Sequence, residues 1–88
     1  MGSEAETTMI YYVAIPFTPA EGGGWAPGQA MECPSASAAI RRAETMSRHE
    51  GNVGAVAFSR NGDPNLGEFD DAVILKSFGD VPDDFGRA

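Results

Sequence analysis

The chain has 88 residues, of which 42% are hydrophobic, and its formal net charge at neutral pH is −7. This length suits one domain with a single modest core, and the hydrophobic fraction is ordinary for a folded protein. The negative charge repels phosphate groups, so we expect no nucleic-acid partner and no binding to a membrane surface.

The first predicted elements are a polar tail and a strand. Residues 1–8 are polar and acidic, which indicates a flexible tail without the basic segment of a signal peptide. Residues 9–17 are rich in β-branched and aromatic side chains and predict a strand that is apolar on both faces. Pro16 cannot donate a ladder hydrogen bond, so the strand should end there or lie at an edge at that point.

A loop and one clear helix follow. Glycine and proline dominate residues 18–28 and predict an irregular loop, and residues 29–33 suit a short strand that pairs back onto the first. Residues 35–50 predict a helix with Ser35 as N-cap and Gly51 as the left-handed residue after its end. Such a helix, about 24 Å long, could cover an eight-residue strand from end to end. Its apolar stripe is narrow and built from small side chains, so it can lie close to a sheet: Ala36, Ala39, Ile40, Ala43, Met46 and Ser47.

Two more strands complete the predicted domain. Residues 53–60 and 72–78 are apolar, and the polar segment between them has the composition of a long loop. Residues 81–88 read as a flexible acidic tail, which leaves a domain at residues 9–80. The order β-(β)-α-β-β predicts a two-layer α+β fold, with three or four mainly antiparallel strands and one helix on one face. The first strand and the strand at 53–60 could form a right-handed parallel crossover if they are neighbours.

The second face of this sheet has no predicted cover. Tyr12, or Val56 and Phe58, would be exposed there, depending on the register. That is a large apolar area for a small monomer, so either loops or another chain should cover it. We therefore expect a non-enzymatic interaction or binding module, as a homodimer or with an unidentified protein partner.

Two other features could contact a partner. Arg41, Arg42 and Arg48 are a basic concentration in an acidic chain. They form either a docking face for an acidic partner or a phosphate group, or a solvated helix face neutralised by Glu44 and Glu50 or by acidic loops of the same chain. Trp25, in the Gly-rich segment, either anchors a partner or folds down over the sheet.

Cys33 is the single cysteine, so no internal disulfide and no cysteine-based zinc site can form. A free thiol suits the reducing cytoplasm, and no apolar stretch is long enough to span a bilayer. Cys33 precedes the predicted helix, where exposed N–H groups stabilise a thiolate. An alternative function is therefore a redox sensor or small enzyme whose thiol is alkylated quickly. The competing interpretation is a structural cysteine, since the second cysteine of thiol oxidoreductases is absent.

Asn61, Asp63 and Asn65 have the spacing of the first calcium ligands of an EF-hand loop. Leu66 and Ala72, however, stand where that loop requires glycine and glutamate. We therefore expect a connecting loop, with neither a metal nor any other cofactor.

Two further candidate sites have little support in the sequence, a site at His49 and a small-ligand site. His49 is the sole histidine and has no partner ligand nearby in the sequence. A small ligand could bind between the Gly-rich segment and residues 61–71, although nothing in the sequence identifies it.

The C-terminal half resembles a group of short, uncharacterised bacterial proteins. The resemblance rests on the tract from Gly54 to Arg60, then Gly62-Asp-Pro64, residues 67–72 and residues 78–82. It extends mainly over residues 35–84. No activity is attached to that group, so the resemblance implies a stand-alone domain and assigns no site residue.

Overall fold

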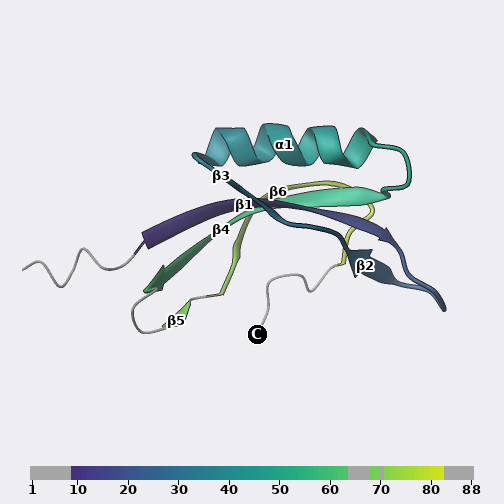
Figure 1. Cartoon of the computed structure of the whole chain (residues 1–88), viewed down its shortest axis with the longest axis horizontal. Coiled ribbons are helices and arrows are strands. Elements are labelled where there is room, and N and C mark those ends of the chain that lie inside the picture. Colours follow the sequence, from purple (N-terminus) through teal and green to yellow (C-terminus); the bar gives the residue numbers. More distant parts are fainter. Residues whose placement is uncertain (1–8, 64–67, 70, 83–88) are drawn as a thin grey trace, which may run out of the picture.

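The structure is a computed structural model that describes residues 9–63, 68–69 and 71–82 (Figure 1). It has two layers, with one helix along one face of an antiparallel sheet, as the α+β prediction requires. The tails expected at residues 1–8 and 81–88 lie outside the described residues, except for 81–82. The elements are β1 (Met9–Pro19), β2 (Trp25–Pro27), β3 (Met31–Cys33), α1 (Ala36–Arg48), β4 (Gly54–Asp63), β5 (Glu68–Phe69) and β6 (Val73–Gly79).

The two long strands, β1 and β4, form the centre of the sheet. They are antiparallel and pair continuously from Met9 opposite Gly62 to Phe17 opposite Gly54. β2 and β3 pair with the other side of β1, and β5 and β6 pair with the other side of β4. The short strand expected before the helix is confirmed as β3.

The predicted parallel crossover is wrong, because β1 and β4 are neighbours that run in opposite directions. β3 turns the chain back along β1 before the helix begins, with Cys33 opposite Tyr12. α1 therefore connects β3 to β4, which run parallel to each other on either side of β1.

The Gly-rich segment forms a hairpin, where the sequence predicted an irregular loop. β1 continues to Pro19, and β2 returns from Trp25 along it. Gly22, Gly23 and Gly24 all have positive φ, and the turn is closed by hydrogen bonds between Ala20 and both Gly23 and Gly24. The glycines thus allow a tight reversal that other residues would strain.

Pro16 lies inside β1, and it divides the strand's outer neighbour into two pieces. The carbonyl of Pro16 accepts a hydrogen bond from the N–H of Gly28, but its ring nitrogen can donate none. Between its pairing with β3 and its pairing with β2, β1 has one residue fewer than the segment that runs beside it. A Cβ on Gly28 would lie 2.9 Å from Cγ of Pro16, so the close approach requires glycine.

The helix begins as predicted and ends earlier. The Ser35 hydroxyl accepts a hydrogen bond from the N–H of Ala38 at 3.1 Å, which confirms the N-cap. The helix ends at Arg48, where the Asn52 side chain donates to the carbonyl of Met46. With 13 residues α1 is about 20 Å long, whereas the 10 residues of β4 span about 33 Å. One end of the sheet therefore extends beyond the helix.

The contact between α1 and the sheet is built from alanine. The fully buried residues of this layer have no exposed surface, and larger side chains, including Tyr12, Leu75 and Phe78, surround them. The layer confirms the expectation that small side chains would let the helix lie close to the sheet. Its members are Ala14, Ala39, Ala43, Ala55 and Ala57.

The opposite face has its own core, and of the two covers expected there, loops or another chain, segments of the chain itself supply part. Phe17, Val56 and Phe58 are 3%, 1% and 9% exposed. Ala72 and Val81, from the segments before and after β6, pack against them. The chain thus covers much of this face itself.

The alanine layer should tolerate no larger side chain. We expect Ala43→Leu to lower the free energy of unfolding by about 1–3 kcal/mol, because the added atoms must push the helix from the sheet. Thr45→Leu, at an exposed position of the same helix, should change it by less than about 0.5 kcal/mol. Urea denaturation followed by circular dichroism measures both, and equal effects would contradict the close packing.

Gly79 should be more sensitive to substitution than the hairpin glycines. Gly79 and Gly22 both have positive φ, but a Cβ on Gly79 would lie 2.5 Å from the Val53 carbonyl oxygen, whereas one on Gly22 meets nothing within 4 Å. Gly22→Ala should cost about 1–2 kcal/mol of stability from the backbone conformation alone. Gly79→Ala should cost about 1–3 kcal/mol more. A comparison of their thermal unfolding tests this difference.

Candidate interaction site at the free edge of the sheet

β6 lies at an edge of the sheet and is paired on one side. Among the described residues its strand partner is β4 alone. The other side presents backbone N–H and C=O groups, which another strand can recognise. Val73 and Ile74 are 60% and 43% exposed, so the edge also carries apolar surface.

The two apolar side chains of this edge lie on opposite faces. Ile74 stands opposite Phe58 and so faces away from the helix, whereas Val73 stands opposite Ser59 and faces the helix side. Ile10, which is 56% exposed, is on the helix side as well, beyond the start of α1. We call Val73, Ile74 and the unpaired side of the strand the β6 edge.

The middle of β6 is less suited to pairing. A register shift lies opposite the Ala57–Phe58 step, and the ammonium of Lys76 lies 5.4 Å from the centre of the Phe78 ring. Bulges and lysines are features with which proteins limit indiscriminate pairing of edge strands. The Val73 end is therefore the apolar part of this edge.

Tyr12 and Phe58 do not lie on a free surface of the kind that the sequence suggested. Tyr12 packs against the alanine layer beneath the helix, and Phe58 belongs to the core of the other face. Both contribute to the packing of the monomer, so a change at either would disturb the fold itself.

Trp25 lies at the opposite edge of the sheet from β6. It is the first residue of β2, stands opposite Pro19 in the hairpin and is 39% exposed. Trp25 therefore lies in the hairpin at the end of β1, on a different strand from Tyr12 and Phe58.

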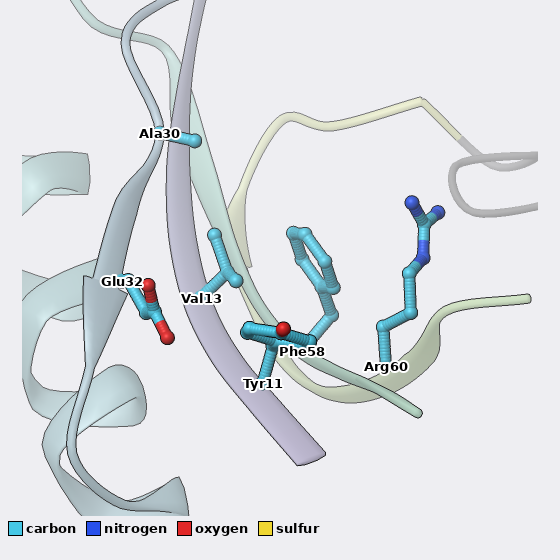
Figure 2. A pocket seen from close by; sticks show the side chains of 6 residues that line it. All are labelled: Tyr11, Val13, Ala30, Glu32, Phe58 and Arg60. Carbon is cyan, nitrogen blue, oxygen red and sulfur yellow. The ribbon is translucent and has the colours of Figure 1, made fainter. Parts of the chain in front are cut away.

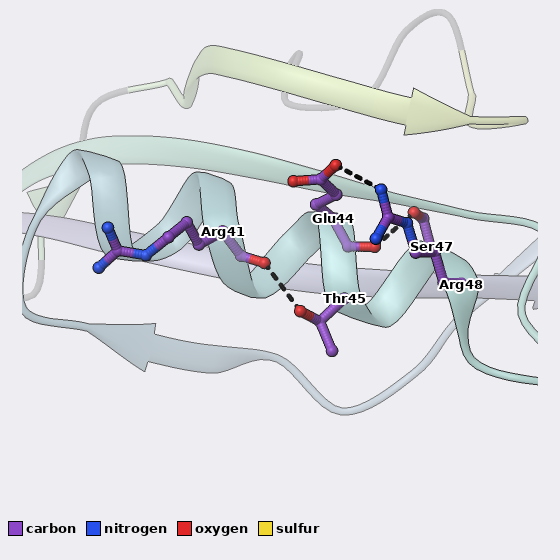
Figure 3. Close-up of polar contacts among 5 residues, drawn as sticks. All are labelled: Arg41, Glu44, Thr45, Ser47 and Arg48. Atoms are coloured by element: carbon purple, nitrogen blue, oxygen red, sulfur yellow. Dashed lines mark hydrogen bonds and ion pairs between the residues drawn. The ribbon is translucent and has the colours of Figure 1, made fainter.

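Arg41 and Arg48 lie on the exposed surface of α1 (Figure 3), and Arg42 is exposed on the same helix. Arg48 donates to the Glu44 carboxylate at 2.8 Å, and both side chains are well exposed, so the pair contributes little to stability. The carbonyl of Arg41 accepts a hydrogen bond from the Thr45 hydroxyl, while the Arg41 side chain extends away from Glu44. Arg48 is thus neutralised locally, and Arg41 remains a solvated cation.

Cys33 ends β3 and lies two residues before the N-cap of the helix. Its thiol donates to the carbonyl of Met31 at 3.6 Å, and its side chain packs against the alanine layer. The Ala38 N–H at the start of the helix is hydrogen-bonded to Ser35. This position matches a structural cysteine better than a nucleophile.

Two of the three residues considered for calcium lie in a strand. Asn61 and Asp63 belong to β4, which is longer than predicted, and Asn65 lies outside the described residues. Within the described ranges, no group of three or more His, Cys, Asp or Glu side chains is placed to hold a metal ion. His49 is exposed at the end of α1.

The described residues do not form the small-ligand site that was predicted between the Gly-rich segment and residues 61–71. The Gly-rich hairpin lies at one end of β1, and residues 61–63 and β5 lie at the other (Figure 1). The sequence analysis did not identify β6 as an edge strand. The consecutive apolar residues Val73, Ile74 and Leu75 could have indicated that this strand carries apolar side chains on both faces.

In comparisons with known proteins, no family model, no curated protein and no solved structure matches the chain. In the part of the chain that the structure describes, no helix has the length and apolar character needed to cross a membrane.

The position of Cys33 predicts a slow thiol. Because its side chain is half-buried against the alanine layer, we expect alkylation by iodoacetamide to be slower than that of free cysteine in the same buffer. The rate should rise when urea unfolds the protein. Mass spectrometry over a time course measures it, and faster alkylation in the folded protein would support the thiol-dependent alternative.

Proposed function

We propose that this protein is a small non-enzymatic interaction module that self-associates through the β6 edge. The observation that carries the proposal is the exposure of Val73 and Ile74 on a strand whose outer side has no strand partner among the described residues. Antiparallel pairing with β6 of a second copy would satisfy backbone groups of both chains. A two-fold axis makes one patch complementary to itself, so a single surface is sufficient for a closed dimer.

The charge distribution favours the same surface. The chain carries 13 acidic and 6 basic side chains, so two copies repel each other over most of their surfaces. β6 contains no acidic residue and one lysine, Lys76. The β6 edge is therefore a place where two acidic copies can approach with little repulsion, and added salt should strengthen the association by screening the rest.

A location in the cytoplasm goes with this proposal, supported by the single unpaired thiol, Cys33. No redox or catalytic role is proposed for that thiol, because its contacts are those of a packed side chain.

A lysine at the free edge should separate the two copies without unfolding either. We expect the wild-type protein to be a dimer by light scattering on a sizing column, and Val73→Lys to weaken the dimer by about tenfold or more, since two added charges would be buried at the interface. Met31→Lys is the matched control, because Met31 is 44% exposed at the opposite edge of the sheet.

The proposal fails if the wild-type protein is a monomer at all concentrations tested. It also fails if Val73→Lys and Met31→Lys lower the solution mass equally. Circular dichroism shows whether both variants keep the wild-type fold.

A further inference from the structure

A pocket of about 340 Å³ lies on the face of the sheet that the helix does not cover (Figure 2). Its volume is in the range of small-molecule sites. The register explains its shape, because Glu32, Val13 and Phe58 form one row across three strands and Tyr11 and Arg60 form the next. The lining residues are Tyr11, Val13, Ala30, Glu32, Phe58 and Arg60.

Arg60 is the basic group of this pocket, and it has no anionic partner among the described residues. Its Nε–H is buried without a hydrogen-bond acceptor, and the ion pair within the described part of the chain is between Arg48 and Glu44. The guanidinium carbon lies 5.9 Å from the centre of the Phe58 ring, at the limit of a cation–π contact. A buried donor without an acceptor is unusual, and a guanidinium fork is well matched to a carboxylate.

The rest of the pocket sets the character of a ligand. Val13, Phe58 and the ring of Tyr11 offer an apolar floor, and Glu32 and Arg60 lie on opposite sides of it (Figure 2). The Glu32 carboxylate and the net charge of −7 disfavour a second negative charge. A dianion such as a phosphate monoester is therefore less suitable than a molecule with a single negative group.

We infer that this pocket binds a small apolar molecule carrying one carboxylate, with Arg60 holding the carboxylate and Phe58, Val13 and Tyr11 contacting the apolar body. No residue that lines the pocket belongs to the β6 edge, although Ile74 of that edge stands opposite Phe58 on the same face of the sheet. The inference does not rest on the proposed dimer.

The probe for this site is 3-phenylpropionate, titrated into the full chain labelled with ¹⁵N. We expect saturable shifts of the Tyr11, Phe58 and Arg60 amide signals with a dissociation constant of about 1 mM or tighter. Phenylpropionamide, which lacks the charge, and phenyl phosphate, which has a second one, should each bind at least about tenfold more weakly.

Arg60→Gln should weaken binding of 3-phenylpropionate by about tenfold or more, since a charge-assisted hydrogen bond is lost. Arg41→Gln removes the same charge from the exposed face of α1 and should leave binding unchanged. If Arg60→Gln does not fold, Arg60→Lys decides, because it keeps the charge without the planar fork. Weaker binding by Arg60→Lys then supports the site, and unchanged binding overturns it.

The inference is also overturned if no saturable shift occurs, if the amide binds as tightly as the carboxylate, or if Arg60→Gln binds like the wild-type protein. Light scattering of the same samples reports the dimer separately, so a failure of the pocket leaves the proposed self-association intact.

Discussion

The helix and the sheet meet through methyl groups, and this close contact limits everything that is placed around it. Ala39 and Ala43 of α1 face Ala14, Ala55 and Ala57 of the two central strands, and none has exposed surface. Such a layer leaves no room for large side chains, so the bulky residues are pushed to its margins or to the other face. Each alanine also buries little apolar area, so this layer alone stabilises the fold weakly.

The second core offsets that weakness. Phe17, Val56 and Phe58 carry their large side chains on the face without a helix, where Val81 and Ala72 help to cover them. The segments on both sides of β6 therefore stabilise the sheet, while β6 itself remains at the edge. The sheet is thus covered on one face by the helix and in part on the other by the segments that flank β6.

Much of this architecture follows from local patterns in the sequence. Ser35 and the alanine stripe predict the start of the helix and its buried face, and the apolar run at residues 9–17 predicts the central strand. The direction of β4 relative to β1 was predicted wrongly, because the reversal of the chain by the short strand before the helix was expected but its consequence for β4 was not followed. The hairpin was missed because three consecutive glycines are compatible with many backbone conformations until the strands around them pair.

The candidate sites were harder to predict than the fold. Sequence reasoning selected residues by type, and in the structure Tyr12 and Phe58 support the core while Trp25 and Arg41 belong to different elements, β2 and α1. Val73 and Arg60 gain importance from position alone: Val73 stands at an edge of the sheet, and the buried Nε–H of Arg60 has no acceptor within the part of the chain that the structure describes. Both properties depend on strand order and register, which a single sequence does not encode locally.

The interruption at Pro16 bears on the size of any assembly. On that side of the sheet, the outer neighbours of β1 are two pieces of three residues each, separated where Pro16 and Gly28 approach each other. Such short pieces are poor templates for a further strand, and short edge strands are a known protection against uncontrolled stacking. A dimer joined at β6 would present these broken margins at both ends. Growth into a fibril would then have no continuous edge to extend, and the assembly would stop at two chains.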